Sequence, residues 1–319
     1  MTVQPPGVPR SAPKRVLVTG ATGFLGRAAA RQLRAAGWDV TGTSGSGLED
    51  TRRADLLDER AVRRLMEEVR PSHLLHAAWR PVHGDVMHSP ENIRWVAASL
   101  LLVQAFQQSG GERAAVVGSS AEYDWTDGIC RNGATPLRPG TIYGACKHAL
   151  HIALAAFARQ TGIGFVWPRV FFVYGPGEDE RRLVASVIRA LLKGVPAECT
   201  EGRQIRDYLH VDDVAAGLVA ALESTYDGPI DLAAGHGVSV RELVTQVARQ
   251  IGREDLLRLG ARPSPSHDVP LVVGDGAEAA SVLGWAPQLS LEQGLADTIA
   301  WGRSVFTQAV PSDHSNEKR

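Results

Sequence analysis

Cysteine is scarce in this chain: three of its 319 residues are Cys, namely Cys130, Cys146 and Cys199. An odd number without C-x-x-C spacing fits a reducing compartment better than a disulfide framework. Histidine patterns typical of metal sites are missing too, because the ten His residues form no H-x-x-x-H motif with a partner acid. We therefore expect neither structural disulfides nor a bound metal.

Excess charge is also lacking. Lys and Arg number 34 against 35 Asp and Glu, which gives a formal net charge of -1. No overall field therefore favours nucleic acid or an anionic membrane surface. No apolar run approaches the length of a membrane-spanning helix, and the proline-rich residues 1–13 lack the apolar core of a signal peptide. We expect a cytoplasmic protein that binds neither nucleic acid nor membrane.

Short apolar runs alternate with helical patterns from residue 14 to residue 170. Such alternation indicates right-handed crossovers and a mostly parallel sheet covered on both faces. After about Phe171 the elements become shorter and richer in Gly and Pro. We predict an α/β protein: a doubly wound, Rossmann-type domain at 14–170, a smaller C-terminal α/β domain at 171–307 with some segments returning to the first, and flexible tails at 1–13 and 308–319. The expected strands are 14–20, 39–44, 73–78, 113–120 and 164–170, and the expected helices end near 36 or span 58–69, 91–108 and 143–160.

Three glycines follow the first expected strand, at positions 20, 23 and 26, where a helix begins. Glycines at this spacing let the backbone turn sharply, approach a pyrophosphate and pack a helix against its strand. The helix N-terminus then presents free N–H groups to the phosphates. Because the triplet lies between a strand and a helix, dinucleotide binding is favoured over a plain turn. The candidate residues are Gly20, Thr22, Gly23, Phe24, Leu25 and Gly26.

The end of the second strand bears on which dinucleotide binds. NAD sites usually carry an acid here that holds the ribose hydroxyls. This chain has no carboxylate after the strand until Glu49. A site without that charge can accept a 2′-phosphate, with Ser44, Arg52 or Arg53 as partners. We expect NADP(H), with NAD(H) as the alternative; a loop that leaves the ribose to be held elsewhere is also open.

Tyr143 and Lys147 are four residues apart on an expected helix, so their side chains share one face. An ammonium and an oxidised nicotinamide both favour the phenolate, and they lower a tyrosine pKa from about 10. Tyr143 can then give a proton to a carbonyl oxygen or take one from an alcohol. Ser119, at the end of the fourth expected strand, can donate a hydrogen bond to the same oxygen. A Tyr and a Lys can occur at this spacing by chance, but the glycine loop upstream and the serine at a strand end favour a catalytic pair.

Several segments, taken in order, resemble the extended short-chain dehydrogenase/reductases, and within them the sugar-nucleotide epimerase/dehydratase/reductase group. The resemblance covers residues 14–305, nearly the whole chain. It rests on the glycine run, Ser119–Tyr123 (SSAEY), the Tyr143/Lys147 pair, Tyr174–Pro176 (YGP), Arg206–Asp213 (RDYLHVDD) and Leu283–Pro287 (LGWAP).

The resemblance implies further site residues. It places Asp55 and Leu56 near the cofactor adenine, and His76, Ala77, Ala78 and Arg169 along the cofactor cleft. It makes the region after residue 171 a sugar-nucleotide domain and implies a homodimer through two Rossmann helices. The candidate substrate contacts are Ser120, Arg206 and Arg262, the two arginines binding the diphosphate with their planar guanidinium groups; surface arginines are the alternative.

The resemblance also narrows the reaction. Family 4,6-dehydratases follow the active-site hydroxyl with an Asp-Glu pair, whereas Ser120 and Ala121 stand here and Glu122 is expected to face the opposite side. Epimerase-reductases similar to GDP-fucose synthase use a Cys and a His, and Ala121 and Gly177 occupy the matching positions. What remains is a ketoreductase acting on a nucleotide-linked 4-keto-6-deoxysugar, which the missing acid favours, or an NAD-dependent C4 epimerase. A cofactor sensor without activity, or a reductase of small carbonyl compounds, stays open.

Four more residues carry structural expectations. Asp207 and Asp213 are expected to cap the following helix. Trp95 stands where many relatives have an asparagine that supports the lysine, and we expect it to fill core. Trp125 either shapes a sugar pocket or fills core.

Overall fold

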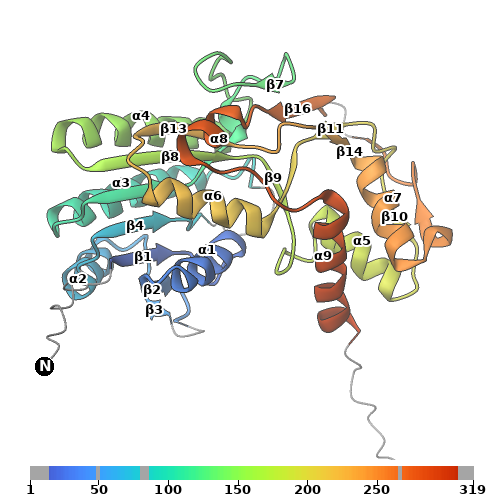
Figure 1. Ribbon diagram of the computed structural model, residues 1–319, viewed down its shortest axis with the longest axis horizontal. Coiled ribbons are helices and arrows are strands. Elements are labelled where there is room, and N and C mark those ends of the chain that lie inside the picture. Colours follow the sequence, from blue (N-terminus) through green and yellow to red (C-terminus); the bar gives the residue numbers. More distant parts are fainter. Residues whose placement is uncertain (1–13, 48–50, 80–85, 265–267, 308–319) are drawn as a thin grey trace, which may run out of the picture.

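A parallel sheet forms the centre of the computed structural model, which describes residues 14–47, 51–79, 86–264 and 268–307. Its strands follow the order β13-β8-β5-β4-β1-β2-β3, and β6 also pairs with β8 (Figure 1). From β1 the chain first runs outward to β3, and then returns to build the other half through β4. The predicted Rossmann-type α/β fold is therefore confirmed. The strands are β1 Arg15–Thr19, β2 Asp39–Ser44, β3 Arg52–Arg53, β4 His73–His76, β5 Arg113–Val116, β6 Gly118–Ser119, β8 Gly164–Val170 and β13 Gly228–Leu232.

Helices cover both faces of this sheet. One face packs α2, α3 and α4 over buried side chains that include Leu17, Leu74 and Phe106. The other face packs α1 and α6 over Val16, Val18 and Leu218. No helix within the described residues is long and apolar enough to cross a membrane. The bounds are α1 Phe24–Ala35, α2 Glu59–Val69, α3 Asn92–Gln108, α4 Ile142–Thr161 and α6 Val211–Glu223.

Two expected strands end earlier than the sequence pattern indicated. The first, expected over 73–78, ends at His76, and its last residues become part of the loop that faces β1. The second, expected over 113–120, breaks at Val117 into β5 and β6, and Ser120–Glu122 turns into a short 3-10 helix, η1. At this break the Val117 carbonyl accepts a hydrogen bond from the Lys147 ammonium (2.8 Å). Apolar content alone could not show this interruption.

The C-terminal half contains a second core between α5 Leu183–Leu192, α7 Val240–Ile251 and α9 Leu291–Phe306, which gather on the right of Figure 1. Small sheets accompany these helices. A mixed sheet has the order β14-β11-β16-β7, and two further pairs are β9 with β12 and β10 with β15. The bounds are β7 Ile129–Cys130, β9 Phe172–Tyr174, β10 Ala197–Glu198, β11 Ile205–Arg206, β12 Tyr208–His210, β14 Val238–Ser239, β15 Leu257–Arg258, β16 Leu271–Gly274 and α8 Ala277–Leu283, with the 3-10 turn η2 at Glu254–Leu256.

The chain crosses between the two halves more than once. Helix α6 packs on the large sheet beside α1, and β13 pairs with β8, although both follow residue 171. In return, β7 pairs with β16 of the small sheet. The predicted tails, 1–13 and 308–319, lie outside the described residues.

Asp207 and Asp213 do hold local structure, but the expected helix caps were wrong. The Asp207 carboxylate accepts backbone N–H bonds from Ala234, Gly235 and Gly274, at 2.8, 3.0 and 3.2 Å. Asp213 accepts those of Gln288 and Leu289, at 2.9 and 3.1 Å. Both acids therefore tie distant loops together, and the backbone amides compensate for burying a carboxylate.

Candidate active site

The glycine run forms a tight backbone cradle between β1 and α1. Gly20 has φ +68°, and a Cβ on it would lie 2.9 Å from Ala78 Cα. A Cβ on Gly26 would lie 2.1 Å from the Gly20 carbonyl oxygen. Helix α1 follows Gly23, whose missing side chain leaves the first N–H groups without a side-chain cap. Thr22, Phe24 and Leu25 are half-buried at the same turn, so the structure brings the predicted phosphate-binding residues together.

His76, Ala77 and Ala78 close over this cradle from the neighbouring strand. The Ala78 N–H donates to Thr19 Oγ1 (3.3 Å). The His76 ring lies between two hydroxyl oxygens, 2.6 Å from Thr19 Oγ1 and 2.8 Å from Ser99 Oγ. Burial, with a contribution from Lys147, lowers the pKa of His76 to about 3. His76 is therefore a neutral ring that links β1, β4 and α3.

The far end of the cradle lies at the loop after β2. Ser44 Oγ is close to Thr51 Oγ1 (2.7 Å) and accepts the Gly47 N–H (2.9 Å). Arg53 is exposed beside this loop, whereas Arg52 is paired with Glu68 (3.1 Å). Glu49 lies outside the described residues. Of the two arginines considered from the sequence, Arg53 is therefore the one left beside Ser44.

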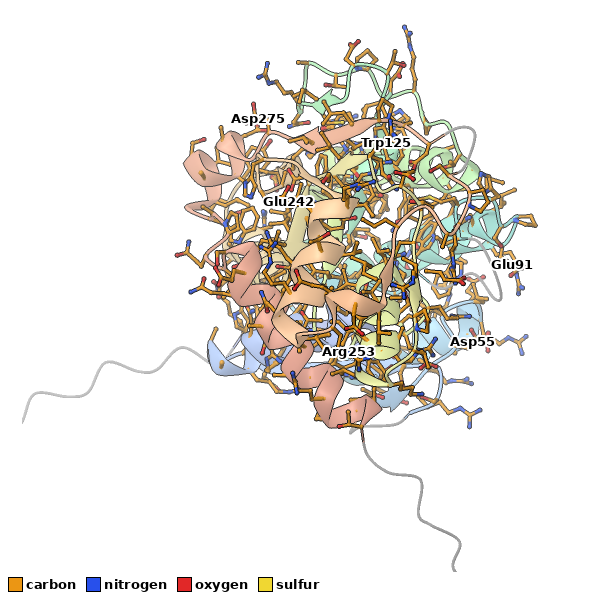
Figure 2. The ribbon with its side chains drawn as sticks, turned by 90° about the vertical axis from the view of Figure 1, so that its right-hand side faces the viewer. Asp55, Glu91, Trp125, Glu242, Arg253 and Asp275 are labelled. Atoms are coloured by element: carbon orange, nitrogen blue, oxygen red, sulfur yellow. The ribbon has the colours of Figure 1, made fainter. Side chains whose placement is uncertain are left out.

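Asp55 and Leu56 follow β3 and differ in exposure. Asp55 is exposed, and its carboxylate accepts the Leu57 N–H (2.9 Å). Leu56 is buried in the core beneath α2 and α3. Figure 2 shows Asp55 low on the molecule and Trp125 near its top. The two predicted ends of the site, adenine and sugar, thus lie in different parts of the molecule.

The structure brings Ser119, Tyr143 and Lys147 together at the start of α4. The helix begins after Thr141, whose Oγ1 accepts the Gly144 N–H (3.1 Å). A Cβ on Gly144 would lie 2.1 Å from the Ala121 carbonyl oxygen, so glycine allows α4 to touch η1. This close approach brings Tyr143 near Ser119, which acts on the pKa of the phenol. The Lys147 ammonium lies 6.0 Å from the centre of the Tyr143 ring.

Burial dominates the electrostatics of the trio. It raises the pKa of Tyr143, and the hydrogen bond with Ser119 opposes that rise. Burial also lowers the pKa of Lys147 to about 7, against the attraction of Glu122. Glu122 and Arg182 act on the phenol in opposite directions. By itself the site therefore holds a neutral phenol beside a cation that is close to losing its proton.

Arg169, expected along the cofactor cleft, lies in a buried network of polar side chains. Its guanidinium is buried, pairs with Glu122 (3.1 Å), and donates to Tyr123 Oη (3.2 Å) and Asn132 Oδ1 (3.0 Å). Glu122 also accepts bonds from Trp167 Nε1 (2.9 Å) and from the Ser119 N–H (2.9 Å). Arg169 therefore holds the Glu122 carboxylate, which in turn accepts the backbone N–H of Ser119. Glu122 was expected to face the opposite side by strand alternation, but it lies in η1 rather than on a strand and is fully buried.

An aromatic row connects Ser120 with Arg206. Trp125 Nε1 donates to the Ser120 carbonyl (2.7 Å), and the Trp125 and Phe172 ring centres are 6.4 Å apart. The Arg206 guanidinium lies 5.4 Å above the Phe172 ring. Of the two readings of Trp125, the sugar-pocket reading gains support because both rings remain partly exposed. This row was not visible as a unit in the sequence, because the loop after η1, β9 and β11 assemble it.

The two predicted diphosphate arginines differ. Arg206 is buried, and its guanidinium is paired with Asp268 (2.5 Å). Arg262 is exposed and lies 3.9 Å from Glu198. The Arg206 guanidinium also donates to the Ile205 carbonyl (2.8 Å), so two of its nitrogen atoms already have partners.

A cavity of about 580 Å³ lies between α1, α6 and α9. Phe24 of the glycine turn and Gly177 line it, together with Asp297 and Trp301. Ser119, Tyr143 and Lys147 do not line it. The trio and the cradle, rather than this cavity, therefore define the candidate site.

Sequence reasoning missed Trp79, which covers the Lys147 ammonium at 3.9 Å from its ring centre. Trp95, expected in the core, is a partly buried residue of α3 that packs against the core, and its ring centre is 6.2 Å from that of Trp79. The position of Trp79, directly after β4 at the carboxyl edge of the sheet, was the available sequence indication.

Comparisons with known proteins show the family and the fold of this chain. The model of the NAD dependent epimerase/dehydratase family matches residues 16–234. A UDP-glucose 4-epimerase of Corynebacterium glutamicum is 28% identical over 302 residues, 86% of this chain and 91% of that protein. MoeE5, solved in complex with UDP-glucose and NAD, is 31% identical with a TM-score of 0.79, over 91% of this chain and 99% of that one. A UDP-glucose 4-epimerase structure from Thermotoga maritima shares the fold, with a TM-score of 0.81 at 24% identity over the same shares.

Proposed function

We propose, from the premise that the chain belongs to the NAD dependent epimerase/dehydratase family, that it reduces the keto group of a nucleotide-linked 4-keto-6-deoxysugar. The observation that carries this proposal is the trio itself. A serine hydroxyl, a phenol and an ammonium meet at the start of α4, next to a backbone cradle in which added Cβ atoms would clash. Carbonyl reduction needs one proton and one hydride at the two ends of the same C=O bond, and the trio supplies the proton.

Each residue has a separate task. A nicotinamide cofactor, when bound, supplies the hydride that the carbonyl carbon accepts. Tyr143 donates its phenolic proton to the carbonyl oxygen, which becomes the alcohol. Ser119 Oγ donates a hydrogen bond to the same oxygen, and the Lys147 ammonium stabilises the phenolate left behind. In the opposite direction Tyr143 takes the proton back, so the same trio oxidises an alcohol.

The cradle fits a dinucleotide, and its far end favours NADP(H) over NAD(H). Ser44 and the exposed Arg53 offer a hydroxyl and a cation to a 2′-phosphate. Phosphate binding to an arginine is a charge-assisted, bidentate interaction. MoeE5 was solved with NAD, which keeps NAD(H) as the second possibility.

The aromatic row suits a deoxysugar. Trp125 and Phe172 offer apolar faces between Ser120, next to the trio, and Arg206. A sugar placed there could rest its apolar face and C6 methyl group on the rings, with its diphosphate at Arg206. Arg262 is the second candidate for the diphosphate.

A C4 epimerase is the second candidate, favoured by the names of the relatives. The C. glutamicum protein is a UDP-glucose 4-epimerase. Such an enzyme would use the same trio twice, first as base and then as acid, with no net use of cofactor.

Two assays separate these reactions. The first follows NADPH absorbance with UDP-, dTDP-, GDP- and CDP-linked 4-keto-6-deoxyglucose, and we expect steady consumption with one of them. The second follows UDP-glucose and UDP-galactose without added cofactor. Interconversion in the second assay together with no consumption in the first would replace reduction by epimerisation. Tyr143→Phe is the control: activity in either assay should fall by about a hundredfold or more, whereas a cofactor sensor would show no turnover to lose.

A further inference from the structure

The indole of Trp79 covers the ammonium of Lys147. The distance from Nζ to the centre of the Trp79 ring is 3.9 Å, well inside the range of a cation–π interaction. The Tyr143 ring is farther from the same atom, at 6.0 Å. Within the described residues Nζ makes one hydrogen bond, to the Val117 carbonyl (2.8 Å), although an ammonium has three donors. A ring face therefore occupies a side of Lys147 where a polar acceptor could have been.

The indole is held in this place. Trp79 Nε1 donates to Asn92 Oδ1 (2.8 Å), and Asn92 is fully buried. The amide of Asn92 cannot be reversed, because its Nδ2 donates to the carbonyls of Val86 (2.7 Å) and Ser89 (2.8 Å). The ring of Tyr143 meets Trp79 edge-on, with centres 6.2 Å apart. Trp79 is thus fixed between an anchored amide and the phenol.

We infer that Trp79 is a positioning residue, whose ring face holds the Lys147 ammonium in place and favours its charged form. The inference rests on the proposed role of Lys147 and adds a residue to it. An ion in this site has lost its water, and the negative face of an indole returns part of the lost stabilisation. Trp95 lies beside Trp79, with ring centres 6.2 Å apart, whereas Trp79 is the indole over Lys147.

The contribution of Trp79 matters because few other groups stabilise the buried Lys147 ammonium: the Val117 carbonyl accepts one hydrogen bond, and Glu122 attracts the charge. Burial lowers the pKa of Lys147 to about 7, and Glu122 acts against this. His76 is neutral, and the phenol of Tyr143 keeps its proton without cofactor. Without the ring face, Lys147 would lose its proton at lower pH and could no longer stabilise a phenolate.

The chain offers a direct test, because it contains four Lys residues, Lys14, Lys147, Lys193 and Lys318. With ¹³Cε-labelled lysine, an NMR titration of the protein without cofactor follows each side chain, and Lys147→Met assigns one resonance. We expect the Lys147 midpoint far below the ordinary lysine value of 10.5. Trp79→Phe should lower it by a few tenths of a unit, and Trp79→Leu by about one unit.

The matched control is Trp95→Leu, which removes the same indole volume from the same cluster. It should move the Lys147 midpoint by much less than Trp79→Leu. The inference is overturned if Trp79→Leu and Trp79→Phe leave the midpoint unchanged, or if Trp95→Leu lowers it equally. The other lysine resonances show whether each variant is folded. Failure of the proposed function would appear elsewhere, as turnover that survives Tyr143→Phe, with the titration unaffected.

Discussion

Lys147 and Arg169 are both buried cations close to Glu122, and their surroundings differ in kind. Arg169 pairs with Glu122 and donates to Tyr123 and Asn132. Although burial opposes it, the attraction of Glu122 raises the pKa of Arg169. Lys147 has a carbonyl and an indole instead, and burial lowers its pKa to about 7. The fold thus neutralises the cation that supports its structure and leaves the one beside the phenol poorly compensated.

The largest effect on stability should come from removing Arg169, the cation that is paired with Glu122. Arg169→Met leaves Glu122 buried without its partner, which costs about 3–5 kcal/mol of unfolding free energy. Urea unfolding measures this loss. Combining Arg169→Met with Glu122→Gln should recover part of it, because the buried Glu122 carboxylate, which lost its partner, is then replaced by a neutral amide. A loss below about 1 kcal/mol in the single variant would contradict the comparison.

Removing Lys147, the poorly compensated cation, should raise the free energy of unfolding rather than lower it. Lys147 has a pKa of about 7 in the folded protein, against 10.5 ordinarily. Between these values the unfolded chain holds a proton that the folded protein has lost, so the free energy of unfolding rises with pH. At and below pH 7 the folded protein bears the full cost of the buried cation.

Lys147→Met should therefore stabilise the protein by about 2 kcal/mol or more near pH 7. The gain should shrink as the pH approaches 10, where folded and unfolded wild-type chains both lose the proton. Urea unfolding at pH 6.5, 8 and 9.5 follows this trend. A destabilising substitution, or a gain that grows with pH, would mean that Lys147 is better compensated than its contacts indicate.

The smallest effect is expected from removing an exposed cation, Arg53, and it concerns cofactor binding rather than stability. Arg53 lies beside the Ser44 loop, so Arg53→Ala should weaken NADPH binding by about five- to tenfold and leave NADH binding nearly unchanged. Calorimetric titration with both cofactors measures the difference. Arg52→Ala is the matched control, since Arg52 is paired with Glu68. Equal losses for both cofactors would remove the case for a 2′-phosphate at Arg53.

Local patterns were enough to predict the large sheet and the trio. The strand Asp39–Ser44 was predicted with its observed bounds, because its turn residues limit it on both sides. Tyr143 and Lys147 share a helix face by spacing alone, and the carboxyl edge of the sheet brings Ser119 to them. Periodicity and strand order determine such features.

What the sequence could not show is how side chains pair when their partners are distant along the chain. Arg169 was expected in the cleft, yet it is 47 residues from the Glu122 that pairs with it. The role of Trp79 depends on Lys147, 68 positions later, and on the orientation of Asn92. Arg206, the candidate for the diphosphate, pairs with Asp268, which is 62 residues away. Sequence spacing along one element carries no information about such pairs.

The central claim is that Tyr143 becomes an acid–base group once an oxidised nicotinamide lies beside it. The chain has five tyrosines, and burial raises the pKa of the other four, to about 12 for Tyr208 and Tyr226. At neutral pH, therefore, no phenolate contributes to the absorbance near 295 nm unless Tyr143 ionises. We predict that saturating NADP⁺ produces one phenolate, titrating at least about one unit below pH 10, and that Tyr143→Phe abolishes it. An absorbance that ignores the cofactor, or that survives in Tyr143→Phe, would contradict the account.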